Sequence, residues 1–250
     1  MRHALTRHVP DSFASALAMT RPPSPIDVAR AQRQHLAYRA ALAACGLDVT
    51  TLPADEACPD CVFVEDTAVI VDRVALITRP GAPSRQPETP PIARALEASC
   101  ELVHMAAPAT LDGGDVLCVG STIFVGRSAR TNEDGIAALR RAFRLRVVPI
   151  ALPPGVLHLK CVVSPLDDET ILLADDSLPH DLFPGLRIVR VPKDETYAAN
   201  AVAINRHVIV AAEHPRTHEL LAAAGFTPHP VPTTEVAKAD GSLTCQSLLW

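Results

Sequence analysis

The feature that most constrains this chain is a pattern that occurs four times: two short apolar strands joined by a polar turn. Such a pattern is typical of a β-hairpin. The hairpins begin about 40–50 residues apart, a spacing that indicates a repeat architecture. They are predicted over residues 61–78, 113–126, 158–174 and 200–211.

A helical pattern follows three of the hairpins, and another short strand follows each helix. The predicted helices are 88–99, 131–144 and 215–224, and the predicted strands are 102–104, 147–150 and 227–231. The repeating unit is therefore β-β-α-β. The third interval, 175–186, is shorter and its helical pattern is weak.

The two ends of the chain are predicted to supply a fifth unit. Residues 3–9 have the pattern of a strand, residues 27–45 that of a helix, and residues 48–52 that of a second strand. The apolar residues around Cys245 would add a third strand. About five such units bury their faces against one another and leave a central axis where strand ends converge. No Ser/Gly linker divides the chain, so residues 1–250 are predicted to form one α/β domain.

Polar residues occur at matching places in these units, inside or at the start of the first strand. They are Glu65-Asp66, Asp112-Gly-Gly-Asp115, His158-Leu-Lys160, Tyr197-Ala-Ala-Asn200 and Cys245. Burying a polar group without a partner costs several kcal/mol, so we expect these groups to meet in a shared polar centre. Adjacent residues of a strand point to opposite faces, so at least one of Glu65 and Asp66 must point inward.

Cys245 is a candidate nucleophile, provided that a histidine and a carboxylate can reach it. It follows a glycine-containing turn and precedes an apolar run, residues 248–250, that would anchor it. Taken alone, a cysteine is more often a small buried hydrophobe. In the same way, His158 alone would be a core histidine and Asp112-Gly-Gly a tight turn. The positions of all three residues within the repeat favour the catalytic interpretation.

The composition excludes several classes of protein. The net charge of −5 and the pI near 6.0 argue against nucleic acid as a partner. No apolar run approaches the ~20 residues of a membrane span, and the N-terminus lacks the apolar core of a secretory signal. Seven cysteines, an odd number, favour reduced thiols and hence the cytoplasm. The sequence leaves a homodimer open.

Two loops could belong to a functional site. Residues 11–25 are irregular and rich in proline and small residues, which suggests a lid. Cys58-Pro-Asp-Cys61 is a weak signal for zinc or redox chemistry, because no second pair follows and no thioredoxin-like context surrounds it. A loop that presents Asp60 is favoured instead, and we expect neither a metal nor another cofactor.

Seven short motifs occur in order between about Leu52 and the C-terminus. They are Phe63-Val-Glu-Asp66, Thr78-Arg-Pro-Gly-Ala-Pro-Ser-Arg85, Leu111-Asp-Gly-Gly-Asp-Val116, Gly126-Arg-Ser-Ala-Arg-Thr-Asn132, Leu157-His-Leu-Lys160, Glu195-Thr-Tyr-Ala-Ala-Asn200 and Asp240-Gly-Ser-Leu-Thr-Cys245. Together they resemble the dimethylarginine dimethylaminohydrolases, guanidine-modifying enzymes of the pentein superfamily. The resemblance implies an α/β fold: a five-bladed α/β propeller (pentein) built from ββαβ repeats with pseudo-five-fold symmetry.

The resemblance also implies a reaction, the hydrolysis of Nω-methylated L-arginine to L-citrulline and methylamine or dimethylamine. Cys245 would attack the guanidinium carbon as a thiolate and form an S-alkylthiouronium intermediate. His158 would protonate the leaving amine and then activate water. Asp112 would orient the histidine, although some relatives carry Glu at this position and Asp is one methylene shorter.

Six further residues are placed around the substrate by the resemblance. Asp66 would bind the guanidinium, with Glu65 and Asp60 beside it. Two arginines would hold the α-carboxylate as a fork, and the lid would offer a backbone carbonyl to the α-amino group. The six residues are Leu17, Asp60, Glu65, Asp66, Arg85 and Arg130. Without the resemblance, the two arginines would be taken for solvated surface charges.

Two other functions compete with this one. A related guanidine enzyme would be an amidinotransferase or an arginine deiminase, but the deiminases carry an extra helical domain for which 250 residues leave no room. A non-enzymatic pentein, such as a ribosome anti-association factor, would only bind a partner. Those proteins lack the set of Cys, His and acid that this sequence contains, which counts against binding alone.

Overall fold

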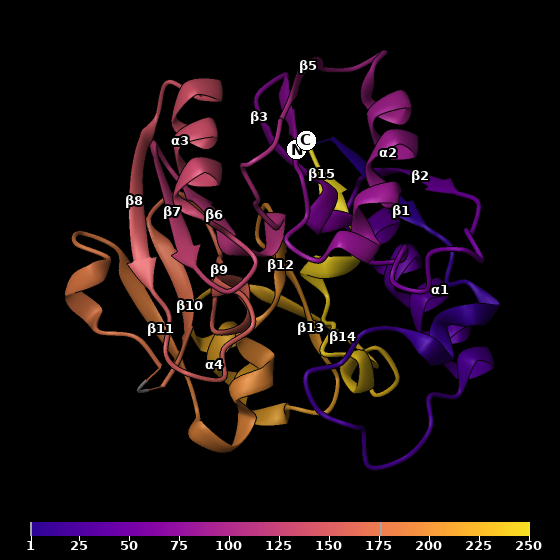
Figure 1. The fold of residues 1–250 in the computed structure, drawn as a ribbon. Helices are drawn as coiled ribbons and strands as arrows, with labels where there is room; N and C mark the ends of the chain where they lie inside the picture. Colours follow the sequence, from indigo (N-terminus) through magenta and orange to yellow (C-terminus); the bar gives the residue numbers. More distant parts are fainter. Residues whose placement is uncertain (1, 176) are drawn as a thin grey trace.

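The computed structural model describes residues 2–175 and 177–250, and this part of the chain contains five mixed sheets of three strands each (Figure 1). In every sheet the first strand pairs antiparallel with the middle strand, and the middle strand pairs parallel with the third. The sheets, written in that order, are β3 (Ala68–Val71), β4 (Val74–Ile77) and β5 (Glu101–His104); β6 (Val116–Val119), β7 (Thr122–Arg127) and β8 (Arg146–Ala151); β9 (Val163–Pro165), β10 (Thr170–Ala174) and β11 (Arg187–Val191); β12 (Val202–Ile204), β13 (His207–Ala211) and β14 (Thr227–Val231); and β15 (Leu248–Leu249), β1 (His3–Arg7) and β2 (Asp48–Leu52).

Helices connect the middle strand to the third strand in four of these sheets. They are α2 (Thr89–Leu96), α3 (Glu133–Ala142), α4 (Pro215–Ala223) and, in the sheet that contains both chain ends, α1 (Val28–Ala44). Parallel neighbours need such a crossover connection, whereas antiparallel neighbours are joined by short turns. Between β10 and β11 the described residues hold only a 3₁₀ turn, His180–Leu182, in agreement with the weak helical pattern there.

The fifth sheet joins the beginning of the chain to its end, as the sequence predicted. Leu5 in β1 is the register partner of Leu248 in β15 and of Thr50 in β2. Figure 1 shows the two termini meeting beside β15. This closure anchors the C-terminal residues, and so it fixes the position of the adjacent Cys245.

Local sequence explains where α1 starts and stops. The Asp27 side chain accepts a hydrogen bond from the Arg30 amide and so caps the first turn. Gly46, at φ +94°, ends the helix in a conformation that favours glycine. Tyr38 and Leu42 are fully buried one turn apart on the face that packs against the sheets. No helix among the described residues is long and apolar enough to cross a membrane.

The polar residues predicted to lie in strands occupy short 3₁₀ turns instead, and this is a correction to the sequence analysis. A 3₁₀ turn precedes the first strand of every sheet; these turns are η2 (Val64–Thr67), η4 (Gly113–Asp115), η5 (Leu159–Cys161), η7 (Lys193–Ala199) and η9 (Thr244–Gln246). Glu65 and Asp66 therefore lie in η2, and Cys245 lies in η9. The reason is that strand pairing starts only at the following apolar residues, because the polar side chains bind one another rather than neighbouring strands.

The five turns form a closed ring of hydrogen bonds, which we call the central ring. Its bonds link each turn to the next: Gly114 N to Asp66 Oδ1 (2.9 Å), Leu159 N to Asp115 Oδ1 (3.1 Å), Asn200 Nδ2 to Lys160 O (2.9 Å), Thr244 N to Asn200 Oδ1 (2.9 Å) and Thr244 Oγ1 to Glu65 Oε2 (2.8 Å). The prediction that these polar groups share one centre is thus confirmed.

Candidate active site

Seven of the nine predicted site residues line one cavity of about 30 Å³, which we call the site cavity. They are Leu17, Asp60, Asp66, Arg85, Arg130, His158 and Cys245. The other two lie nearby but outside its lining. Asp112 is fully buried behind the histidine, and Glu65 faces a different cavity.

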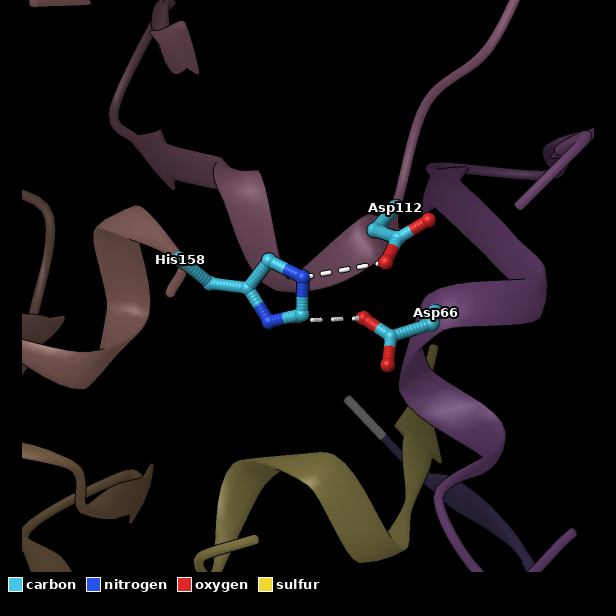
Figure 2. Close-up of side chains that lie close together, drawn as sticks. All are labelled: Asp66, Asp112 and His158. Atoms are coloured by element: carbon cyan, nitrogen blue, oxygen red, sulfur yellow. Dashed lines mark hydrogen bonds and ion pairs between the residues drawn. The ribbon is translucent and has the colours of Figure 1, made fainter. Parts of the chain in front are cut away.

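The imidazole of His158 faces two carboxylates, Asp66 from η2 and Asp112, the residue before η4 (Figure 2). Its Nε2 lies 3.0 Å from Asp112 Oδ2, and its Nδ1 lies 4.0 Å from Asp66 Oδ1. Burial alone would lower the pKa of His158, but Asp66, the hydrogen bond to Asp112 and the charge of Asp115 raise it to about 9. The ring is therefore an imidazolium at neutral pH and can donate a proton.

Gly114 lets these groups approach one another closely. A Cβ at this position would lie 2.7 Å from His158 Nδ1 and 2.9 Å from Asp66 Oδ1. The amide of Gly114 also donates to Asp66 Oδ1. The Asp112-Gly-Gly motif thus does more than make a turn, because its second glycine leaves room for the histidine.

Asp112 is held in place by groups other than the histidine. Its Oδ1 accepts a hydrogen bond from the Gly81 amide at 2.8 Å. Its Oδ2, which contacts His158, also lies 3.4 Å from Nη1 of Arg130. Although Asp is shorter than the Glu of some relatives, its geometry here allows direct contact with the imidazole.

Arg85 is buried and already bound to the protein. Its Nη1 lies 2.5 Å from Asp66 Oδ2, and its Nη2 lies 2.8 Å from both Glu88 Oε2 and the Phe63 carbonyl oxygen. Burial would raise the pKa of Asp66, but the positive His158 and Arg85 lower it to about 2. Glu88 was not predicted as a site residue. It lies three residues after Arg85 in the same 3₁₀ helix, a spacing that brings the two side chains together.

Arg130 is the more accessible of the two arginines. Its side chain is 21% exposed, against 5% for Arg85. Among the described residues it forms an ion pair with Asp112, at 3.4 Å. Exposed donors can bind an incoming anion without first leaving a buried carboxylate. The two arginines predicted to form one fork therefore differ: Arg85 is bound to buried carboxylates, whereas Arg130 is more accessible to a ligand.

The predicted lid covers the site cavity. Leu17 lines the cavity, is 40% exposed and donates its backbone N–H to Asp60 Oδ1 at 3.0 Å. The Met19 amide contacts Asp240 Oδ2, on the loop that leads to Cys245. The loop is thus fastened by two carboxylates from separate parts of the chain.

Cys245 is a half-buried free cysteine whose surroundings oppose ionisation. Burial raises the pKa of Cys245 well above its usual range, and the negative Glu65 and Asp66 raise it further. A cation bound against Asp66 would oppose these effects and favour the thiolate. The site is therefore suited to a positively charged ligand.

Glu65 opens toward a cavity of about 200 Å³ on the other side of the central ring, which we call the central cavity. The first strands of all five sheets contribute to its wall, through residues such as Val69, Leu117, Pro165, Val202 and Leu248. Glu65 Oε1 lies 2.5 Å from Lys160 Nζ. The structure thus separates Glu65 from the other predicted substrate ligands.

Three potential metal ligands lie close together in the site. One atom each of Asp66, Asp112 and His158 falls within 4.8 Å of the other two. Arg85 and Arg130 already contact these carboxylates, so the arrangement fits an imidazolium between two acids. That the protein uses no metal stays a prediction.

Comparison with known proteins identifies the family. A family model described as eukaryotic N,N dimethylarginine dimethylhydrolase matches residues 16–219. The chain belongs to the dimethylarginine dimethylaminohydrolase family. It is 40% identical to the N(G),N(G)-dimethylarginine dimethylaminohydrolase of Streptomyces coelicolor, an alignment that covers 99% of this chain and 96% of the relative.

Solved structures of this family superpose closely on the chain. A cysteine-to-serine variant of the Pseudomonas aeruginosa enzyme, complexed with citrulline, matches with a TM-score of 0.93 and 37% identity over 99% of this chain and 98% of that one. A histidine-to-glycine variant of a dimethylarginine dimethylaminohydrolase, solved as an adduct with S-methyl-L-thiocitrulline, matches equally well, with the same TM-score, identity and coverage.

Proposed function

We propose that this protein hydrolyses Nω-methylated L-arginine, either asymmetric dimethylarginine or monomethylarginine, to L-citrulline and dimethylamine or methylamine. The observation that carries the proposal is that Cys245, a protonated His158 and the ionised Asp66 line one cavity. A guanidinium needs all three, namely a nucleophile, a proton donor for the amine and a negative group that holds the cation. Membership of the family supports the same conclusion.

The first half-reaction replaces the amine by sulfur. The guanidinium against Asp66 favours ionisation of Cys245, whose proton is released to solvent, and the thiolate attacks the central carbon. The C–N bond to the methylated nitrogen breaks, His158 gives that nitrogen its proton, and an S-alkylthiouronium remains on the cysteine. Asp112 keeps the imidazole oriented and stabilises its protonated form, as its 3.0 Å contact allows.

The second half-reaction reverses the role of the histidine. The neutral imidazole takes a proton from water, and the resulting hydroxide attacks the thiouronium carbon. Cleavage of the C–S bond releases citrulline and returns the proton and the thiol. No step needs an oxidant, a metal or a cofactor.

Substrate binding requires the lid to move. The site cavity of about 30 Å³ holds roughly one water molecule, far less than an arginine. Opening would break the Leu17–Asp60 contact and free Asp60 for the substrate. Arg130 is the first partner for the α-carboxylate, with Arg85 behind it, and the Leu17 carbonyl would accept from the α-amino group once the lid closes.

We also propose that the five sheets form a five-bladed α/β propeller with pseudo-five-fold symmetry, with the central ring around its axis. The identical strand order in all five sheets of the described chain supports this arrangement. Location in the cytoplasm, the absence of nucleic-acid and membrane partners, and a homodimer stay predictions.

A citrulline assay tests the function. Monomethylarginine and asymmetric dimethylarginine should be converted, and Cys245→Ser should abolish conversion while the fold is retained. Cys118→Ser, which changes a thiol that faces the central cavity, is the matched control and should retain activity. Conversion of unmethylated arginine alone would favour a deiminase, and wild-type turnover by Cys245→Ser would contradict the mechanism.

A further inference from the structure

The ion pair between Lys160 and Glu65 lies beneath the nucleophile, on the side away from the substrate. Both side chains are largely buried, at 14% and 9% exposed, and both line the central cavity rather than the site cavity. A buried ion pair contributes little to stability on average, because desolvation offsets the attraction between the charges. Its place in the molecule therefore calls for a functional explanation.

A side-chain path leads from this ion pair to the residue before Cys245, and the backbone of Lys160 supports the same residue separately. Glu65 Oε2 accepts a hydrogen bond from Thr244 Oγ1, and Thr244 is the residue before the cysteine. The carbonyl oxygen of Lys160 accepts from Asn200 Nδ2, and Asn200 Oδ1 in turn accepts from the Thr244 amide. The Lys160 side chain is thus connected to the nucleophile through Glu65 and Thr244, whereas the Lys160 carbonyl contact does not depend on the side chain.

The charges that face Cys245 come from two turns of the ring. Glu65 and Asp66 in η2 are negative, and burial and these two carboxylates oppose ionisation of the thiol. Across from them, η5 brings the neutral thiol of Cys161, and His158 stands at its start. Asp66 is neutralised by Arg85 and His158.

Glu65 has a different partner. Among the described residues Glu65 forms an ion pair with Lys160, at 2.5 Å. Each carboxylate beside the nucleophile therefore has its own cation, and the cation of Glu65 is reached from the central cavity rather than from the substrate side.

We propose that Lys160 is a positioning residue for Cys245: it neutralises Glu65 behind the nucleophile and, through Thr244, keeps the thiol ready to ionise when the substrate binds. The proposal rests on the proposed role of Cys245 as nucleophile. It assigns Glu65 to the support of the cysteine rather than to contact with the guanidinium. The substrate cation, bound against Asp66, would then favour ionisation of Cys245 without also having to offset the charge of Glu65.

Alkylation of Cys245 by iodoacetamide tests the proposal without any turnover. The rate is followed by mass spectrometry of the Cys245 peptide between pH 7 and 10, where carboxylates stay ionised. Lys160→Met should lower the rate roughly tenfold throughout this pH range, because the rate follows the thiolate fraction and losing a neighbouring cation typically raises the thiol pKa by about one unit. Lys160→Arg should retain the wild-type profile, because the central cavity leaves space for the larger cation.

Removing the charge of Glu65 should change the alkylation of Cys245 in the opposite direction. Glu65→Gln should raise the alkylation rate, and Lys160→Met combined with Glu65→Gln should return the rate close to the wild-type value. A merely structural role would move all variants in the same direction. Should Lys160→Met fail to fold, Glu65→Gln and the double variant, which leave no buried carboxylate unpaired, still give the comparison.

Lys238→Met is the matched control, since Lys238 also pairs with a buried glutamate, Glu235, but outside the central ring. It should leave the alkylation profile unchanged. In the citrulline assay Lys160→Met should lower kcat with little change in KM, because Lys160 does not line the site cavity.

An unchanged alkylation rate in Lys160→Met, or rate changes of the same sign in Lys160→Met and Glu65→Gln, would overturn the proposal. These results are distinct from failure of the proposed function. Wild-type turnover by Cys245→Ser would remove the function and leave the alkylation profiles to be judged separately.

Discussion

Arg85→Met is expected to destabilise the protein far more than the equivalent change at Arg130. Arg85 is 4% exposed and binds two carboxylates that are themselves buried, Asp66 at 3% and Glu88 at 1%. Methionine fills a similar volume but leaves Glu88 without its cation and Asp66 with His158 alone. Breaking a buried ion pair in this way costs about 3–5 kcal/mol, a large part of the 5–15 kcal/mol that stabilises a typical domain.

Urea unfolding measures the loss. The single tryptophan, Trp250, stacks on His3 at 5.4 Å in the sheet that joins the chain ends, so its fluorescence should report unfolding. With a slope of about 3 kcal/mol per molar urea, the midpoint of Arg85→Met should fall by roughly 1–2 M. Arg130→Met, which removes one 3.4 Å contact of a partly exposed side chain, should lose less than about 1 kcal/mol.

The pH dependence of that loss follows from the same cause. Burial already raises the pKa of Glu88 to about 7, and without Arg85 the pKa values of Glu88 and Asp66 should rise further, so their ionised forms destabilise the fold at neutral pH. On acidification they take up protons and the deficit should shrink. Arg85→Met combined with Glu88→Leu should recover part of the stability at pH 7. Equal unfolding midpoints for Arg85→Met and Arg130→Met would refute this reasoning.

Three further predictions concern the site. Gly114→Ala should lower kcat about 10- to 100-fold and also lower the melting temperature, because its Cβ displaces the imidazole from its buried carboxylate partners; steady-state kinetics and a thermal melt check it, and wild-type kcat would contradict it. The pKa of His158 is raised from 6.5 to about 9, so its imidazolium form should contribute ~3 kcal/mol to the free energy of unfolding below pH 6.5. This contribution should be lost as the pH rises through about 9, and kcat should fall over the same range. His158→Gly should lack this pH dependence in urea unfolding from about pH 6 to 10. Arg130→Met should raise KM for methylarginine roughly 10- to 100-fold and leave agmatine analogues, which lack the carboxylate, unaffected; equal losses for both would count against the carboxylate assignment.

The strand and helix pattern of this fold was largely predictable from the sequence. Strands such as β10 and β13 are continuous apolar runs between turns, and a period of two or 3.6 is a local property of the sequence. The repeat of that pattern also predicted that the chain ends would share a sheet. Local patterns suffice here because every unit uses the same connection between its strands.

The 3₁₀ turns could not be predicted in the same way. In η2 two acidic residues directly precede an apolar strand, and alternation alone extends the strand back over Glu65 and Asp66. What ends the strand is the set of partners that these acids find in other units, Lys160 and Thr244 for one and Arg85 for the other. Those contacts span up to 179 residues of sequence, so no local pattern contains them.

Adjacent residues of a 3₁₀ turn have different roles at this site, one facing the site cavity and the other binding within the central ring. Successive residues in such a turn are about 120° apart, so neighbours point in different directions. Asp66 faces the site cavity whereas Glu65 faces the central cavity. Cys245 likewise lines the site cavity while Thr244 binds the ring. One residue of each pair is thus free for chemistry because its neighbour fixes the turn, and this is why a substitution at Lys160, outside the site cavity, is expected to change the reactivity of the nucleophile.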